Sequence, residues 1–205
     1  NKVEDLKIIE SQYISAKNVI PRKPLGPNAR RAGWQGCYLE FPSEVITEII
    51  EITLMIGGAG GGFRSLFSKY DVYYSLLKNL LIDKRDLITG IDLDIEEVVT
   101  FNDCIHLISD IKNDFPNMTI SMSPIQFSLE TDVPGMGGFS YKDILNTKLV
   151  DYFIGQFYTD FSVDAFTKCV QNGYPPEMIV IGSISGQDFG DNLDAISEIK
   201  KKYPN

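Results

Sequence analysis

Three acidic side chains, Asp92, Asp94 and Glu96, occupy alternate positions of one short segment, with isoleucine or leucine between them. Residues at alternate positions of a β-strand lie on the same face of that strand. A strand here therefore lines up three carboxyl groups on one face and aliphatic side chains on the other. Stacked carboxylates are too costly for an apolar core. In a closed barrel they can instead follow the inner wall toward the solvent at its mouth.

Carboxyl groups so close together cannot all ionise at their ordinary pKa values. Mutual repulsion and poor solvation raise at least one of these pKa values. A carboxylic acid that keeps its proton near neutral pH can act as a general acid. We expect Glu96 to be the proton donor, because the C-terminal end of a strand lies at the active face of a TIM barrel.

Other interpretations of the acidic segment remain open at this point. An exposed edge strand can carry the same alternation without any function. An Asp-x-Asp pair can ligate a divalent metal ion, although the interleaved aliphatic residues do not fit an EF-hand loop. Phosphotransfer enzymes that use Asp-x-Asp after a strand are a further competitor.

The elements that must position these acids follow from the apolar pattern. Runs rich in Ile, Val, Phe or Tyr favour strands, at 52–56, 88–95, 118–122, 150–157 and 178–184. Apolar residues at helical spacing lie between or after these runs, at 63–80, 101–111, 162–171 and 193–199. Thr100 and Asp103 predict a capping box at the start of the second of these helices. The alternation predicts a parallel sheet with helices packed outside it, either closed or open.

Composition narrows the class of protein. With 205 residues, 43% of them hydrophobic and 23% charged, the chain is predicted to form one globular domain over residues 1–205. A net charge of −9 argues against nucleic acid as the main partner. No stretch approaches the roughly 20 apolar residues of a membrane helix. Residues 1–50 are predicted to be irregular, with a basic, solvated Pro/Gly loop at 21–36.

Metal and imidazole chemistry find little support in the sequence. Cys37, Cys104 and Cys169 are widely spaced and form no zinc motif or disulfide framework. His106 is the only histidine. We therefore expect no metal site and no cofactor.

The segment from Thr89 to Glu96 resembles the Asp-Gly-x-Asp-x-Asp-x-Glu signature of family 18 glycoside hydrolases, the chitinases and their relatives, at seven of eight positions. Residues 54–58 resemble the family's Ser-x-Gly-Gly strand, and residues 121–124 its Met-Ala-Pro strand. Residues 152–158 resemble the strand that carries Gln-x-Tyr. The four segments follow one another in the expected order and cover most of the chain.

The resemblance implies a TIM-type (β/α)8 barrel. The sequence offers no eighth strand, so we expect this barrel to be incomplete or truncated at its C-terminal strand. The resemblance also implies endo-acting hydrolysis of β-1,4-linked N-acetylglucosamine polymers, with retention, in which the acetamide of the substrate attacks the anomeric carbon. A polysaccharide containing N-acetylglucosamine is then the expected partner, and a secreted or extracellular location is favoured.

The same resemblance assigns roles to individual residues. Glu96 becomes the general acid and base, Asp94 orients the acetamide, Asp92 supports Asp94, and Tyr158 donates a hydrogen bond to the acetamide carbonyl. Four further residues are expected to bind substrate: Gln156, Met122, Gly57 and Gly58. The glycines 57–62 fit a turn that lets substrate approach the backbone rather than a phosphate-binding loop.

Two substituted positions and one missing residue depart from the family pattern. Thr89 replaces the first Asp, Met55 replaces the Ser of Ser-x-Gly-Gly, and no tryptophan follows Trp34. The loss of the first Asp is expected to weaken activity without abolishing it. Two classes of function therefore remain: a retaining chitinase or related endo-acting enzyme, and a weak or inactive chitinase-like protein that binds glycans or has a structural role.

Overall fold

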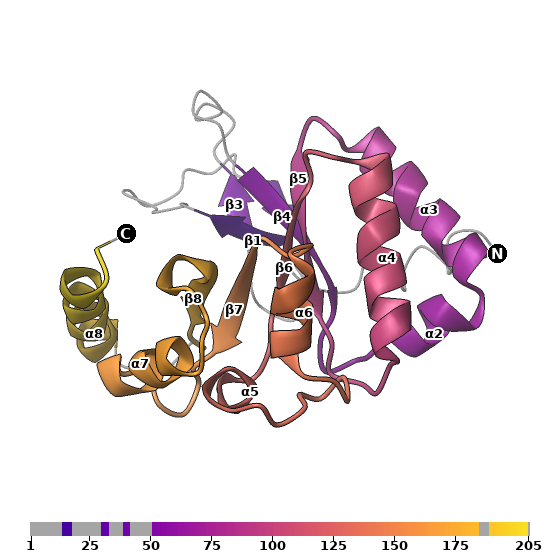
Figure 1. Cartoon of the computed structure of the whole chain (residues 1–205). Helices are drawn as coiled ribbons and strands as arrows, with labels where there is room; N and C mark the ends of the chain where they lie inside the picture. The colour runs from indigo at the N-terminus through magenta and orange to yellow at the C-terminus, as the bar shows by residue number, and fades with distance from the viewer. Residues whose placement is uncertain (1–13, 18–29, 33–38, 42–50, 185–188, 205) are drawn as a thin grey trace.

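The structure is a computed structural model that describes residues 14–17, 30–32, 39–41, 51–184 and 189–204 (Figure 1). Its main sheet has the strand order β1-β4-β5-β6-β7-β8. Strands β4 to β8 are parallel, and β1 pairs antiparallel with β4. The bounds are β1 Ile14–Lys17, β4 Glu51–Gly57, β5 Ile88–Asp94, β6 Thr119–Met122, β7 Tyr152–Gln156 and β8 Ile179–Gly182.

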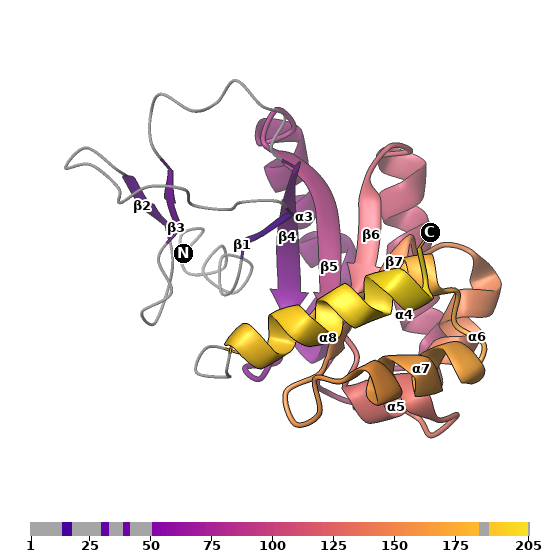
Figure 2. The ribbon, with the colours of Figure 1, turned by 90° about the vertical axis from the view of Figure 1, so that its left-hand side faces the viewer.

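Helices connect the parallel strands, and a last helix follows the final strand. Their bounds are α2 Phe63–Ser68, α3 Tyr70–Asp83, α4 Phe101–Asp114, α5 Gln126–Glu130, α6 Tyr141–Thr147, α7 Val163–Gln171, the 3-10 turn η1 Pro176–Met178, and α8 Phe189–Lys202. Figure 2 shows α5 and α7 next to each other at the end of the sheet toward which β4 points. This end carries the C-terminal ends of the parallel strands.

Local sequence explains where the helices start. The Thr100 hydroxyl accepts a hydrogen bond from Asp103 N–H at 3.0 Å, which confirms Thr100 as the predicted cap of α4. Leu107, Ile108 and Ile111 form the buried face of that helix. The predicted helix over 63–80 is interrupted at Lys69, which separates α2 from α3.

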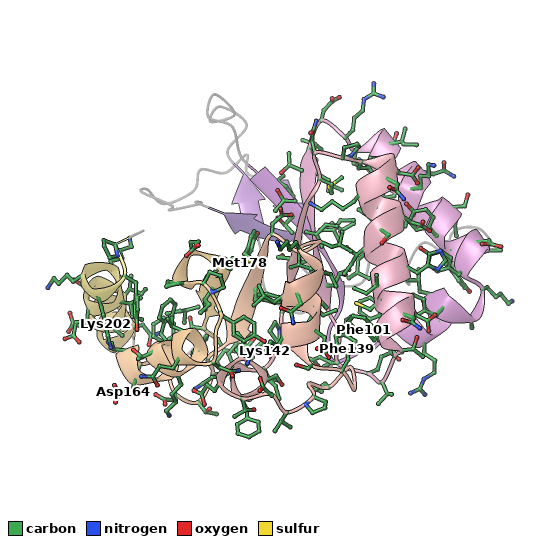
Figure 3. The ribbon with its side chains drawn as sticks, viewed as in Figure 1. Phe101, Phe139, Lys142, Asp164, Met178 and Lys202 are labelled. Atoms are coloured by element: carbon green, nitrogen blue, oxygen red, sulfur yellow. The ribbon has the colours of Figure 1, made fainter. Side chains whose placement is uncertain are left out.

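The core lies between the helices and one face of the sheet. Ile91 and Leu93 of β5 are fully buried on that face. The Phe153 ring of β7 makes edge contacts with Tyr141 and Tyr174, with ring centroids 6.2 and 5.5 Å apart. Phe101 of α4 also meets Phe139, with ring centroids 6.1 Å apart (Figure 3). Aliphatic and aromatic burial therefore holds the helix-facing side of the sheet.

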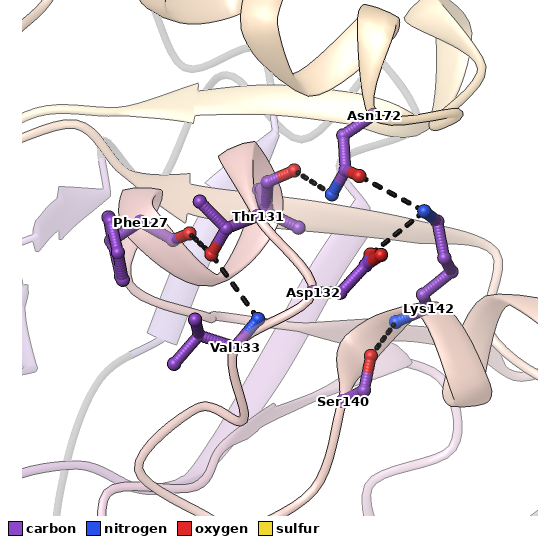
Figure 4. A network of polar contacts seen from close by, with 8 residues as sticks. Phe127, Thr131, Asp132, Val133, Ser140, Lys142 and Asn172 are labelled. Atoms are coloured by element: carbon purple, nitrogen blue, oxygen red, sulfur yellow. Dashed lines mark hydrogen bonds and ion pairs between the residues drawn. The ribbon is translucent and has the colours of Figure 1, made fainter.

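A polar network joins α5, α6 and α7 (Figure 4). Lys142 Nζ of α6 donates to Asp132 Oδ1 at 2.8 Å and to Asn172 Oδ1 at 3.0 Å. The Asn172 side-chain amide donates to the Leu129 carbonyl at 2.9 Å. These bonds fix the helices that follow β6 and β7.

This architecture confirms the predicted α/β fold with the strand-helix alternation of a TIM-type barrel. Within the described residues the sheet is open, with β1 and β8 at its edges, so the barrel is incomplete. Of the predicted basic loop, residues 30–32 form strand β2, which pairs antiparallel with β3, Leu39–Phe41. The rest of that loop, including Trp34, is outside the described residues. No helix in the described ranges is long and apolar enough to cross a membrane.

Candidate active site

Strand β5 holds the acids on the sheet face opposite the helices. It lies between β4 and β6, so the alternative of an exposed edge strand is wrong. Asp92 is completely buried and Asp94 is 7% exposed. Glu96 lies two residues beyond the end of β5 and is half-buried. The burial of the acids thus decreases toward the C-terminal end of the strand, where solvent reaches the last one.

Two serines of the β6 segment hold Asp92. Ser121 Oγ donates to Asp92 Oδ1 at 2.6 Å, and Ser123 Oγ donates to Asp92 Oδ2 at 2.6 Å. Ser121 is the register partner of Asp92 in the parallel ladder, and Ser123 lies two residues further on the same face. Burial raises the pKa of Asp92, whereas both hydroxyl bonds act to lower it. Each carboxylate oxygen therefore has a donor inside the protein.

The pKa of Asp94 is raised as well. Burial raises its pKa to about 7, and the negative charges of Glu96 and then Asp92 add to this effect. The sequence predicted a raised pKa for at least one of Asp92, Asp94 and Glu96, and the structure shows this for Asp92 and Asp94. The choice of Glu96 as the proton donor stays a prediction.

Gln156 connects β7 to the acids. Its Nε2 lies 3.2 Å from Asp94 Oδ1, 3.4 Å from Glu96 Oε1 and 2.9 Å from the Ser123 carbonyl oxygen. The Gln156 backbone N–H donates to the Pro124 carbonyl at 2.9 Å, which fixes the residue at the end of its strand. One amide group thus contacts two consecutive acids.

Gly57 and Gly58 bring the end of β4 against β5. Gly57 has a φ of +101°, and a Cβ atom there would lie 2.1 Å from the Asp94 carbonyl oxygen. Gly58 N–H donates to that same oxygen at 2.8 Å. Only glycine permits this approach at position 57. Both glycines lie beside the acids and contact the backbone of the acidic strand.

Three further positions discussed from the sequence are Met122, Tyr158 and Thr89. Met122 is fully buried in the core and pairs in register with Leu93, on the face opposite the acids. Tyr158 follows Gln156 by two positions and is 41% exposed. Thr89 lies at the opposite end of β5 from Glu96, is exposed, and its hydroxyl donates to the Ile52 carbonyl at 3.5 Å. The bonds of Asp92 to Ser121 and Ser123 are present with Thr89 at this end of the strand.

The sequence did not predict the two serines as partners of Asp92. The only signal in the sequence was their alternation in the segment 121–124. The register of β6 on β5, which the structure provides, places them against Asp92. Within the described part of the chain, no group of three or more His, Cys, Asp or Glu side chains is arranged to hold a metal ion.

Solved structures that share this fold include the following two. A fungal endo-β-N-acetylglucosaminidase from glycosyl hydrolase family 18 is 24% identical, with a TM-score of 0.66 over 74% of this chain and 59% of that protein. The chitinase ChiC from Aspergillus fumigatus is 23% identical, with a TM-score of 0.62 over 73% of this chain and 60% of that protein. The chain thus spans about three fifths of the length of each. At this identity, the likeness establishes the barrel fold.

The profile of the DpnI, Dam-replacing family matches residues 1–56. Most of these residues are outside the described ranges. The match ends before Gly57, so it does not include the acids or the glycines beside them.

Proposed function

We propose that this chain hydrolyses β-1,4-linked N-acetylglucosamine polymers, with retention and with Glu96 as general acid and base. The observation that carries the proposal is the contact of Gln156 with both Asp94 and Glu96 at the C-terminal end of the parallel strands, beside the serine-bound Asp92 of the same strand. Active sites of TIM barrels lie at this end. The shared fold of the two family 18 proteins supports the same assignment.

In the first step, Glu96 donates a proton to the glycosidic oxygen as the bond from that oxygen to the anomeric carbon breaks. The acetamide carbonyl oxygen of the substrate attacks the anomeric carbon and forms a cyclic oxazolinium ion. In the second step, the Glu96 carboxylate removes a proton from water, and this water opens the ring with retention. Glu96 is the half-buried end of the ladder, so both leaving group and water can reach it.

In this proposal Asp94 orients the acetamide group of the substrate. With a pKa of about 7 it exchanges a proton at neutral pH, and as a carboxylate it balances the positive charge on the oxazolinium ion. Asp92, which is fixed by Ser121 and Ser123, lies two residues before Asp94 on β5 and supports it. Gln156 lines the acetamide subsite, and Tyr158 donates to the acetamide carbonyl.

The location of all three acids on one segment of the chain favours attack by the acetamide of the substrate over attack by a carboxylate of the enzyme. Retaining enzymes of the two-carboxylate type place the acids on opposite sides of the scissile bond. Here Asp92 and Asp94 belong to β5 and Glu96 follows two residues after its end, so all three acids come from one continuous segment. Gln156 contacts both Asp94 and Glu96. The nucleophile is therefore better supplied by the substrate.

A second candidate function is glycan binding without hydrolysis. The chain's only tryptophan, Trp34, is outside the described residues, so no indole ring is among the residues described near the acids. In the family that the sequence resembles, a tryptophan ring forms the floor of the acetamide subsite. A different residue at that place would orient the acetamide differently.

Turnover of a fluorogenic chitobioside and chitotrioside by the purified chain separates the two candidates. Hydrolysis, together with inhibition by a thiazoline analogue of the oxazolinium ion, supports the enzyme. Binding of chitooligosaccharides without release of the fluorophore supports the glycan-binding protein. Hydrolysis that is insensitive to millimolar thiazoline contradicts substrate assistance.

A further inference from the structure

Glu97 directly follows Glu96 and contacts the glycine loop, residues 58–62, that connects β4 to α2. Its Oε1 accepts hydrogen bonds from the backbone N–H groups of Gly62 at 2.5 Å and Phe63 at 2.6 Å. The first N–H groups of a helix have no acceptor within that helix. A carboxylate supplied from another segment satisfies two of them with charge-assisted bonds.

The other end of the glycine loop is attached to the same acidic segment. Gly58 N–H donates to the Asp94 carbonyl at 2.8 Å, and Gly61 N–H donates to the Gly58 carbonyl at 2.8 Å. The loop is therefore bonded on both sides of Glu96 in sequence, at residue 94 and at residue 97.

The Glu97 carboxylate is itself held in a confined place. Its side chain is 16% exposed, and the adjacent Phe63 is fully buried. A Cβ atom on Gly61 would lie 3.2 Å from Glu97 Oε1, so glycine leaves room for the carboxylate. Arg64 Nε lies 3.9 Å from Glu97 Oε2, but the Arg64 side chain is 78% exposed. The backbone bonds, rather than the exposed ion pair, define the position of Glu97.

Glu96 needs such support because β5 ends at Asp94. Beyond that residue the strand ladder no longer fixes the backbone. Reacting groups must be held to a fraction of an ångström, and a displacement of about 1 Å can reduce the rate about 100-fold.

We propose that Glu97 is a positioning residue: its bonds to Gly62 and Phe63 fasten the glycine loop to the acidic segment and hold Glu96 in its working place. This inference rests on the proposed hydrolase function. It adds a residue outside the acid ladder on which the rate depends.

Three variants test the proposal. Glu97→Ala removes the acceptor, and we expect kcat to fall about 10- to 100-fold with KM changed less than about threefold. Glu97→Gln keeps an acceptor oxygen at the same reach, so kcat is expected to stay within about threefold of the native value. Arg64→Ala is the matched control, because it removes only the exposed partner of Glu97.

A second measurement follows the loop directly. Native-state hydrogen exchange at the Gly62 and Phe63 amides should be faster in Glu97→Ala and close to the native rate in Glu97→Gln. Thermal unfolding of each variant ensures that the comparison is made well below its midpoint. If Glu97→Ala does not fold, Glu97→Asp replaces it, because its shorter side chain cannot reach both amides.

The outcomes separate the two proposals. Native kcat in Glu97→Ala, or equal losses in the Ala and Gln variants, overturns the positioning role. If the unmodified chain turns over no chitooligosaccharide, the proposed hydrolase function fails, and the role of Glu97 in catalysis fails with it. The exchange rates at Gly62 and Phe63 then still decide whether Glu97 fastens the loop.

Discussion

Gln156 Nε2 of β7 lies 3.2 Å from Asp94 Oδ1 of β5, although β6 lies between these two strands in the sheet. The side chain passes the end of β6 and also donates to the Ser123 carbonyl just beyond that strand. Three strands are thus joined by one amide group. This contact makes the acids of β5 and the end of β7 parts of one site, and it supports an enzyme rather than a row of unrelated surface charges.

Replacement of Glu96 by Gln should abolish hydrolysis while binding is kept. The amide has nearly the shape of the acid but cannot donate the proton, and general acid catalysis contributes about 100- to 10,000-fold. Release of fluorophore from a chitotrioside measures the rate, and titration calorimetry measures binding. Glu198→Gln, on the exposed side of α8, is the control and should behave as the native chain. Unchanged turnover in Glu96→Gln would refute its assignment as proton donor.

Replacement of Asp94 by Asn should make folding stability less dependent on pH. The pKa of Asp94 is raised from its ordinary value of 3.8 to about 7, so the folded protein keeps a proton that the unfolded chain loses. Stability from this group is complete below about pH 4 and decreases as pH rises toward 7, by at most roughly 4 kcal/mol at about 1.4 kcal/mol per pKa unit. Denaturant unfolding at pH 4 and pH 8 measures it. The Asn variant should gain stability relative to the native chain at pH 8; an equal difference at both pH values contradicts the assignment.

Replacement of Ser121 or Ser123 by Ala should destabilise the protein more at neutral than at acidic pH. Each change leaves one oxygen of the buried Asp92 without its hydroxyl donor, at a cost of about 1–3 kcal/mol. The pKa of Asp92 should rise further, so the penalty grows as pH increases. Denaturant unfolding at pH 4.5 and 7.5 provides the comparison. Ser75→Ala, at an exposed position of α3, should change neither value.

Replacement of Gly57 by Ala should be far more damaging than the same change at Gly173. The two residues have nearly equal φ values, +101° and +99°, so the backbone strain is matched. A Cβ atom at position 57 would overlap the Asp94 carbonyl oxygen at 2.1 Å, whereas at position 173 its nearest neighbour is Lys142 Cε at 3.7 Å. Strain alone costs about 1–3 kcal/mol. Thermal unfolding and turnover should show a larger loss of both for Gly57→Ala, and equal losses would show that the contact with β5 is unimportant.

Much of the fold could be predicted because each parallel strand is a local apolar run. The predicted strand 88–95 differs from β5 only at its last residue. The helices α5 and α6 were not predicted, because they have only five and seven residues and leave too few turns for a helical pattern. The break at Lys69 was also missed, because the apolar spacing continues across it.

The site was predictable only where it is local. The common face of the acids follows from alternation within a single strand. Whether Met122 or its neighbours Ser121 and Ser123 share that face depends on the register of β6 on β5, which the sequence alone does not determine. Likewise, the raised pKa of Asp94 depends on burial by elements far away in the sequence.

The pairing of Asp92 with Ser121 also bears on how the protein must fold. A slip of β5 by a single residue against β6 would turn Leu93 toward the serines and drive the carboxyl groups into the helix-covered core. The slipped register is therefore destabilised in two ways: carboxyl groups are buried in the apolar core, and the hydroxyls of Ser121 and Ser123 lose their acceptors. Assembly of the acid ladder should be an all-or-none event, and a population of misfolded molecules should carry no residual activity.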